Sequence, residues 1–224
     1  MLPPILHQDD RILVIDKPTG LLSVPGIGPE KADCMISRIQ ASFPEARIVH
    51  RLDRDTSGVI VLARDAEAHR ELSRQFHDRE VEKTYFALVG GHPVDDLFRV
   101  NLPIRKDLDN PPCQIVDFIH GKASVTDWRV TSRGSLGDLN EEITNPEADH
   151  RMEIARLELR PLTGRSHQLR VHLKVMGFPI LGDDLYASWE YRNATPRLCL
   201  HSSRLWLVHP STASPMVFNS PPPF

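Results

Sequence analysis

Cysteine, aromatic residues and long apolar runs are all scarce in this chain of 224 residues. The three cysteines, Cys34, Cys113 and Cys199, lie far apart and form no CxxC pair, so we expect neither a disulfide framework nor a zinc site. The longest clean apolar run has about six residues, whereas a membrane helix needs roughly 20. The first ten residues lack the basic and apolar regions of a signal peptide. These absences favour a cytoplasmic globular protein.

An excess of basic charge is missing as well, because the formal net charge is −3 at pH 7. The sum alone argues mildly against a nucleic-acid binder, but binding depends on where the charges lie. Residues 151–174 contain six Lys or Arg and two acids, whereas residues 134–149 contain five acids and no Lys or Arg. We therefore expect a basic surface and a separate acidic segment.

Enough apolar material is present for a core, since 40% of the residues are hydrophobic. Strands outnumber helices and do not alternate with them as a doubly wound fold requires, so the predicted class is α+β with a mixed or largely antiparallel sheet. We expect one domain, residues 1–224, with an acidic loop insertion at 131–150. The predicted strands are 11–15, 58–63, 81–91 and 151–162, and residues 197–210 are predicted to form a strand or a hairpin. The predicted helices are 31–43, 65–79 with Asp65 as N-cap, and a stretch within 163–177 that is capped by Ser166 and closed by Gly177.

Three residues stand out as candidates for chemistry. Asp53 lies in HRLDRDTSG, directly before the apolar run VIVLA, where a carboxylate can act as nucleophile, general base or ion-pair partner. Arg165 in TGRSHQLR can grip a carboxylate with two hydrogen bonds, and Tyr85 in VEKTYFALV can stack on a base or move a proton. Taken singly, a turn-capping aspartate, a surface arginine and a core tyrosine are the favoured interpretations. His167 and His172 are five residues apart without clustered Cys or Asp, so no metal site is expected.

Taken together and in order, the motifs are more specific. KPTGLLSVPG, HRLDRDTSGVIVLA, EKTYFALV, LTGRSHQLRVHL and LCLHSSRL resemble the RluA-type family of pseudouridine synthases over nearly the whole chain. The resemblance implies the pseudouridine synthase fold, with helices and loops flanking a central sheet and a catalytic cleft across it. It also implies an isomerase that converts a uridine in RNA to pseudouridine without a cofactor.

The same resemblance implies a set of site residues. Asp53 is the expected catalytic aspartate, Arg165 its ion-pair partner, and Tyr85 the ring that packs against the target base. Arg51 is expected to project into the RNA and hold the flipped nucleotide, and Leu198 and Leu200 to wall the pocket. His50 and Arg170 are further expected substrate-binding residues, and the basic residues expected to hold phosphates around the cleft are Arg51, Arg54, Lys83, Arg165 and Arg170.

The spacing of the motifs is closest to the short members of the family, which lack an extra N-terminal RNA-binding domain and modify both a large-subunit (23S) rRNA hairpin and tRNA anticodon stem-loops. Structured RNA is therefore the expected partner, the protein is expected to be a cytoplasmic monomer, and no membrane or protein partner is implied. Residues 131–150 are longer than the short turn that the resemblance predicts. We expect this segment to lie away from the bound RNA.

Two other functions are compatible with the individual residues. A non-catalytic RNA-binding module that kept the fold predicts RNA binding that survives Asp53→Asn, without isomerisation. A hydrolase that uses Asp53 and a histidine such as His50 or His167 predicts a cleaved product instead of an isomer of the same mass.

Overall fold

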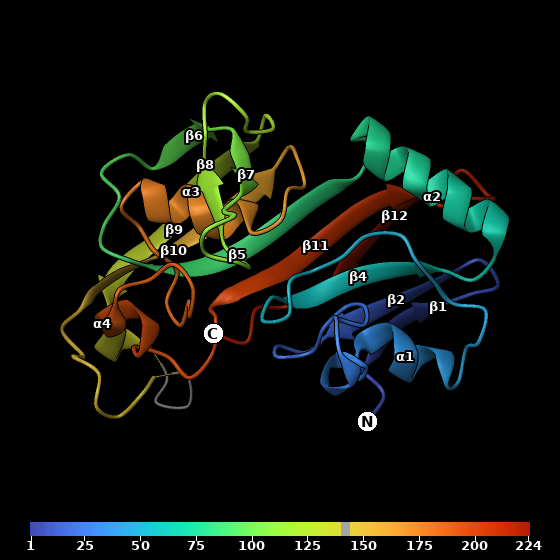
Figure 1. Cartoon of the computed structure of the whole chain (residues 1–224), viewed down its shortest axis with the longest axis horizontal. Coiled ribbons are helices and arrows are strands. Elements are labelled where there is room, and N and C mark those ends of the chain that lie inside the picture. Colours follow the sequence, from blue (N-terminus) through green and yellow to red (C-terminus); the bar gives the residue numbers. More distant parts are fainter. Residues whose placement is uncertain (140–143) are drawn as a thin grey trace. The chain divides into compact units, whose positions relative to one another are not determined.

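The computed structural model describes residues 1–139 and 144–224, which form two compact units (Figure 1). Unit 1 contains residues 1–83 and 201–222, and unit 2 contains residues 84–200 and 223–224. Within the described residues, no helix has both the length and the apolar character needed to cross a membrane. The expected organisation as one catalytic domain stays a prediction.

Unit 1 is built around a mixed sheet in the order β1-β2-β4-β11, with β12 beside β11 and β3 beside β4. β4 pairs in parallel with β11, and the remaining pairs in this unit are antiparallel. All seven residues of β4 are buried, which explains why its sequence is apolar without alternation. The strands are β1 (Ile5–Gln8), β2 (Ile12–Lys17), β3 (Arg47–Ile48), β4 (Ser57–Ala63), β11 (Leu200–Val208) and β12 (Pro215–Asn219).

The main helix of unit 1 is α2 (Ala66–Asp78), which confirms the predicted helix at 65–79. The carboxylate of Asp65 accepts hydrogen bonds from the amides of Glu67 and Ala68 and so caps the first turn. Ala68 and Leu72 pack with the apolar residues of β2, β4 and β11 in one hydrophobic cluster. The predicted helix at 31–43 is shorter in the structure, where a 3-10 turn, η1 (Pro29–Lys31), precedes α1 (Met35–Gln40).

Unit 2 has an antiparallel sheet in the order β5-β10-β9-β6 and a separate two-stranded sheet, β7-β8. With unit 1, it confirms the predicted α+β class with a mixed sheet and few helices. The strands are β5 (Glu82–Gly90), β6 (Leu97–Asn101), β7 (Ile104–Lys106), β8 (Gln114–Val116), β9 (Val125–Ser135) and β10 (Glu153–Pro161). The helices are η2 (Leu136–Asp138), α3 (Gln168–Val175) and α4 (Trp189–Arg192).

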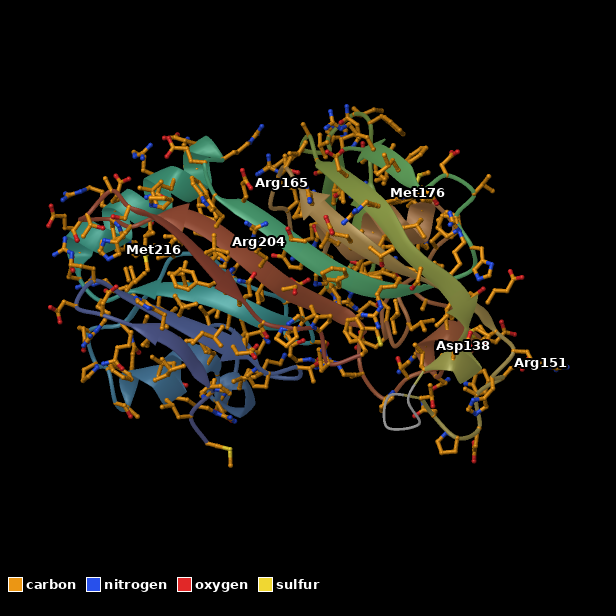
Figure 2. The ribbon with its side chains drawn as sticks, turned by 180° about the vertical axis from the view of Figure 1, so that it is seen from behind. Asp138, Arg151, Arg165, Met176, Arg204 and Met216 are labelled. Atoms are coloured by element: carbon orange, nitrogen blue, oxygen red, sulfur yellow. The ribbon has the colours of Figure 1, made fainter. Side chains whose placement is uncertain are left out.

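The acidic segment predicted as a loop at 131–150 is partly regular. β9 continues to Ser135, which pairs with Glu153 of β10, and η2 follows directly. Asp138 accepts a hydrogen bond from the Ser135 amide, and Figure 2 shows Asp138 and Arg151 at the same end of unit 2. The strand persists because β10 supplies its hydrogen-bond partners, which composition alone does not reveal. Residues 140–143 of this segment lie outside the described residues.

The two faces of the unit 2 sheet differ. His172 of α3 hydrogen-bonds the Thr126 hydroxyl at 2.9 Å, so α3 covers the face on which Thr126 and Trp128 lie. Leu159 of β10 lies directly opposite Trp128 of β9 on one side and Tyr85 of β5 on the other. Residues that lie opposite each other on neighbouring strands share a face, so Tyr85 is on the face that α3 covers. The next residues along these strands therefore lie on the opposite face of the sheet.

Candidate active site

Asp53 lies in the loop between β3 and β4 of unit 1, at the point where the charged motif meets the buried strand. Leu52 is buried, Asp53 is half-buried, and Arg51 and Arg54 are exposed. The buried leucine anchors the loop, while the flanking arginines extend to solvent.

The backbone on both sides of Asp53 is held by the segment KPTGLLSVPG, residues 17–26. The Ser23 hydroxyl donates to the Leu52 carbonyl at 2.6 Å and accepts from the Leu52 amide at 3.2 Å. The Lys17 ammonium, which is fully buried, donates to the Arg54 carbonyl at 2.9 Å. We call this arrangement the Asp53 clamp, formed by Lys17 and Ser23. It fixes the residues before and after Asp53 by contacts to the backbone.

Lys17 also organises its own segment. Its ammonium donates to the carbonyls of Pro18 and Leu21, in addition to the carbonyl of Arg54. Thr19 adds a hydrogen bond from its hydroxyl to the Asp55 carbonyl at 2.7 Å. A buried ammonium is costly unless its hydrogen bonds are made, and these carbonyls provide them. The segment thus serves as a support for the Asp53 loop.

His50 positions the start of the loop. Its Nε2 accepts a hydrogen bond from the Val61 amide at 3.2 Å, and its ring stacks on Phe76 of α2 with centroids 4.3 Å apart. Burial, together with the charge of Lys83, lowers the pKa of His50 to about 3. The ring is therefore neutral at physiological pH and contributes no positive charge toward a phosphate. The prediction that His50 contacts substrate stays a prediction, and its observed contacts are with the fold.

The Ser-Gly that ends the motif fixes the start of β4 against β11. The Ser57 hydroxyl hydrogen-bonds Nδ1 of His201 at 2.8 Å, and Ser57 and Gly58 are in register with His201 and Ser202. Gly58 has φ +111°, and a Cβ there would overlap the Ser202 carbonyl. Glycine is thus required for the two strands to approach at this point.

The Arg165 loop of unit 2 is held by one buried side chain, Gln168. Its Oε1 accepts from the Arg165 amide at 3.1 Å and from the Thr163 hydroxyl at 2.7 Å. Its Nε2 donates to the Val125 carbonyl and the Thr126 hydroxyl at 2.9 and 3.0 Å. The Arg165 side chain is exposed, and its Nε reaches the Ala123 carbonyl at 3.4 Å. All four hydrogen-bonding positions of this amide are used to fix the loop.

The prediction that Ser166 caps the helix is wrong. α3 begins at Gln168, and the N-cap residue is His167, whose backbone is left-handed with φ 52°. Nδ1 of His167 lies 2.7 Å from the Tyr186 hydroxyl, which also accepts from the Gln114 amide. Gln168 replaces Ser166 as the side chain that bonds the loop, and the Tyr186 contact holds His167 in a conformation that non-glycine residues seldom adopt.

The three apolar or aromatic candidates of unit 2 are buried. Tyr85 lies on β5, on the sheet face that α3 covers. Leu200 is the first residue of β11, Leu198 lies two residues before it, and both are buried. Their predicted roles against the target base stay predictions.

Arg170 does not fit its predicted role in phosphate binding. It is 2% exposed, and its guanidinium makes a bidentate pair with Asp183 at 2.8 and 2.6 Å and a further contact with Asp184 at 2.9 Å. It also lies over the Tyr186 ring. A guanidinium held in this way stabilises the packing beneath α3, so we correct the expectation that it faces RNA.

The sequence-predicted site residues thus divide between the units. Unit 1 supplies Asp53, Arg51 and His50, and unit 2 supplies Tyr85, Arg165, Leu198 and Leu200. The ion pair between Asp53 and Arg165 stays a prediction. Sequence reasoning missed the side chains that position the two loops: Lys17, Ser23 and Gln168. These residues could have been noticed because Lys17 and Ser23 lie in the motif KPTGLLSVPG and Gln168 lies in the motif LTGRSHQLRVHL.

Comparison with known proteins gives a consistent result. Residues 11–174 match the family model described as RNA pseudouridylate synthase. The chain is 46% identical over 214 residues to the dual-specificity RNA pseudouridine synthase RluA of Yersinia pestis, covering 96% of each protein. It is 46% identical over 220 residues to the protein of the same name from Escherichia coli K12, covering 98% of this chain and 93% of that one.

Among solved structures, human RNA pseudouridylate synthase domain containing 1 aligns with 99% of this chain and 84% of its own, with a TM-score of 0.79 and 26% identity. The human domain containing 4 protein has the same fold, with a TM-score of 0.71 over 98% of this chain and 88% of its own at 24% identity. Motifs, fold and full-length identity agree, and the chain belongs to the RNA pseudouridylate synthase family, whose members are isomerases.

Proposed function

We propose that this protein isomerises a uridine to pseudouridine in both a 23S rRNA hairpin and a tRNA anticodon stem-loop, and that Asp53 is the catalytic residue. The dual substrate range is supported by the names of relatives that are 46% identical over nearly their full length. The single observation that carries the role of Asp53 is the clamp: Ser23 and Lys17 bond backbone atoms of the residues on either side of Asp53, and not its carboxylate. The proposed location is the cytoplasm, and the proposed state is a monomer.

The other roles follow the matching motifs. Arg165 is the proposed partner of the Asp53 carboxylate, and its loop is fixed through the backbone in the same manner. Tyr85 packs against the target base, Leu198 and Leu200 wall the pocket, and Arg51, whose side chain is exposed, holds the flipped nucleotide. A uridine in a stem-loop must leave the stack to reach a half-buried carboxylate. Stacking on Tyr85 returns about 1–3 kcal/mol of that cost.

The reaction suits this set of groups. The N1–C1′ bond breaks, the base turns, C5 bonds to C1′, the proton on C5 leaves, and N1 takes up a proton. The product has the same mass as the substrate, so the reaction consumes neither a group donor nor a redox partner. A positioned carboxylate assists either by adding to the base or sugar or by taking part in loss of a sugar proton.

The geometry around His50 counts against a hydrolase that uses this histidine as a base. Its Nε2 already accepts the Val61 amide hydrogen, and burial together with the charge of Lys83 lowers its pKa to about 3. A general base works best with a pKa near the operating pH.

The test is release of tritium from C5 of labelled uridine in two transcripts, an anticodon stem-loop and a 23S rRNA hairpin. We expect wild type to release tritium from both, with no cleavage of the RNA, and Asp53→Asn to release none above background. Asp55→Asn is the matched control, because Asp55 lies in the same loop and pairs with Arg54 at its surface. Release by Asp53→Asn at the wild-type rate would falsify the role of Asp53, and release from one transcript only would restrict the substrate range to that RNA.

A further inference from the structure

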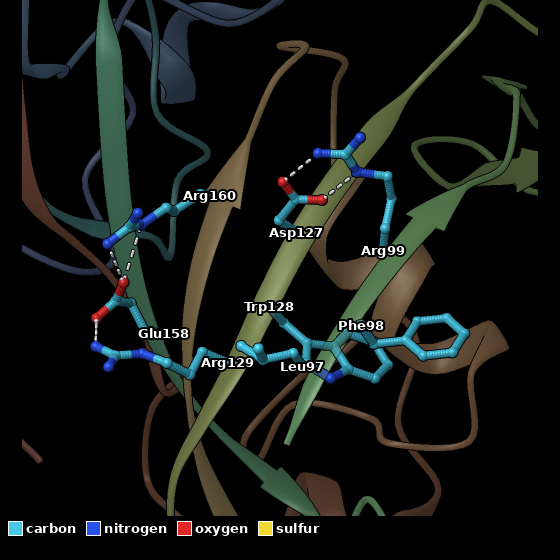
Figure 3. A pocket seen from close by; sticks show the side chains of 8 residues that line it. All are labelled: Leu97, Phe98, Arg99, Asp127, Trp128, Arg129, Glu158 and Arg160. Atoms are coloured by element: carbon cyan, nitrogen blue, oxygen red, sulfur yellow. Dashed lines mark hydrogen bonds and ion pairs between the residues drawn. The ribbon is translucent and has the colours of Figure 1, made fainter. Parts of the chain in front are cut away.

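A hollow lies against strands β6, β9 and β10 of the unit 2 sheet (Figure 3). Its charged lining residues lie on the face of the sheet opposite Tyr85. In the register of β10 with β9, Glu158 lies opposite Arg129 and Arg160 lies opposite Asp127, so these four residues are on one face of the sheet. Leu159 and Trp128, which lie between them, belong to the face that α3 covers. The hollow has a volume of about 580 Å³. Its lining residues are Leu97, Phe98, Arg99, Asp127, Trp128, Arg129, Glu158 and Arg160.

Arginine predominates among its charged groups. Arg99, Arg129 and Arg160 come from three neighbouring strands, β6, β9 and β10, and only two carboxylates accompany them. Three arginines against two carboxylates leave a local excess of one positive charge, although the whole chain has a net charge of −3.

The carboxylates hold the guanidinium groups in place and leave them accessible. Glu158 accepts from Arg129 at 2.6 Å and from Arg160 at 2.8 Å, and Asp127 accepts from Arg99 at 2.6 and 2.7 Å. The arginine side chains remain 63%, 56% and 63% exposed for Arg99, Arg129 and Arg160, whereas that of Glu158 is 10% exposed. Because each guanidinium has five N–H groups, these pairs leave donors on each arginine for a further anion.

We propose that this hollow is a second RNA-binding site, which holds phosphates of the substrate RNA that lie beyond the nucleotides at Asp53. The geometry points to RNA because fixed, exposed guanidinium groups in a row across adjacent strands match phosphate oxygens, and because RNA is the substrate of this family. The ordering of the arginines by Glu158 and Asp127 lowers the entropy that they lose on binding. The inference rests on the proposed function for the identity of the RNA.

The position of the hollow makes the proposal specific. Since its charged groups lie on the face opposite Tyr85, we expect an RNA that ends close to the target uridine not to reach them and a longer RNA to reach them. We therefore expect the site to contribute to affinity for a full-length tRNA transcript and not for the isolated anticodon stem-loop of the same tRNA. It is expected to contribute to binding and not to the chemical step.

The test uses Arg129→Gln and Arg160→Gln in the full chain. Either variant leaves Glu158 with its other arginine, so no buried carboxylate is stranded. We expect the Kd for full-length tRNA, measured by filter binding, to rise about three- to tenfold in each. The slope of log Kd against log salt concentration should fall by about 1. The Kd for the isolated stem-loop and the single-turnover rate of tritium release should stay within twofold of wild type.

Two further variants sharpen the result. Glu158→Gln removes a negative charge and keeps an acceptor for the arginines, so it should tighten binding of full-length tRNA by about twofold or more. Arg74→Gln is the matched control, because Arg74 is a 47% exposed arginine on α2 that is paired with Glu71, Asp78 and Glu80, and should leave both Kd values unchanged.

Unchanged Kd and salt dependence for full-length tRNA in both arginine variants would overturn the proposal and leave an acidic protein segment as the alternative ligand. An equal loss of affinity for the short stem-loop would also overturn it, because the arginines would then act at or near the active site. Binding is measured separately from tritium release, so a failure of the proposed isomerase activity is distinguishable from a failure of this site.

Discussion

In unit 1, the backbone on both sides of Asp53 is held by Lys17 and Ser23, which lie 37 and 29 residues before their partners Arg54 and Leu52. In unit 2, the backbone at Arg165 is held by Gln168, only three residues further along the chain. Both loops are held by side chains that bond backbone atoms beside the functional residues. The Asp53 loop therefore depends on a segment that is distant in the sequence, whereas the Arg165 loop depends chiefly on α3, the helix that follows it.

This difference says where each loop is vulnerable. A substitution in the segment KPTGLLSVPG should displace Asp53, because side chains of this segment bond the backbone of residues 52, 54 and 55. A change at Gln168 should displace Arg165 and loosen the start of α3 together. Variants in the two supports therefore affect different functional residues.

The largest effect is expected from Lys17→Met. Three carbonyl groups lose a charged donor, so we expect the free energy of unfolding in urea to fall by about 2–4 kcal/mol. The single-turnover rate of tritium release should fall about ten- to hundredfold because Asp53 is displaced. Lys31→Met, an exposed lysine in the same N-terminal region, is the control and should change neither quantity. If folded Lys17→Met reacts at the wild-type rate, the clamp has no part in positioning Asp53.

Gln168→Leu is expected to be the next largest change. It leaves the Thr163 and Arg165 donors and the Val125 and Thr126 acceptors without their amide partner, which should cost about 2–3 kcal/mol of unfolding free energy. Gln168→Glu keeps both acceptor contacts and, when its carboxyl group is protonated, one donor, so it should lose less when both variants are unfolded at a pH low enough to keep the carboxyl protonated. Gln114→Leu is the control, since among the described residues the side-chain amide of Gln114 makes one long contact, to the Pro112 carbonyl at 3.4 Å. Equal stability of the Leu and Glu variants would contradict the account of this loop.

The stability of the unit that holds Asp53 should depend on pH through His50. Burial and the charge of Lys83 lower the folded-state pKa of His50 from 6.5 to about 3, so between these values the unfolded chain binds a proton that the folded chain does not. Its contribution to stability is therefore present above pH 6.5 and is lost as the pH falls toward 3. We expect about 1–2 kcal/mol less stability at pH 5 than at pH 7 from this group.

His50→Gln isolates that contribution, because glutamine does not titrate in this range. Urea unfolding of both proteins at pH 7 and pH 5 should show a smaller fall in the variant. The same fall in both proteins would mean that His50 titrates alike in the folded and unfolded chains.

The smallest predicted effect concerns a further support of the first loop, the bond between Ser57 and His201 at the start of β4. In a double-mutant cycle with Ser57→Ala and His201→Gln, we expect a coupling energy of about 1 kcal/mol in unfolding free energy. His201→Asn places an oxygen near the position of Nδ1 and should retain part of the coupling. Strict additivity of Ser57→Ala and His201→Gln would show that the bond contributes nothing.

The sequence allowed some of these features to be predicted. The helix α2 was predictable because a capping aspartate and regularly spaced apolar residues act locally, and β4 was predictable as a continuous apolar run. The motifs also singled out Asp53, Arg165 and Tyr85. These predictions depend on neighbours in the chain or on resemblance to a family.

Other features depend on contacts that spacing does not encode. The bonds of Lys17 and Ser23 cross about 30 residues or more, and a buried lysine is unexpected from its composition alone. Ser166 was the expected cap, but His167 adopts a left-handed conformation and the Gln168 side chain turns back to bond the loop. Arg170 resembled a phosphate ligand until Asp183, 13 residues away, was found to hold it. Each error arose where tertiary contacts override local pattern.

The most direct test of the central claim is a crystal structure of Asp53→Asn bound to an anticodon stem-loop that contains the target uridine. The account predicts a uridine flipped out of its stack, with the side chains of residue 53 and Arg165 within about 4 Å of the base or its ribose and the Tyr85 ring against the base. A uridine that remains stacked, or a flipped base that only one of these three side chains contacts, would contradict it.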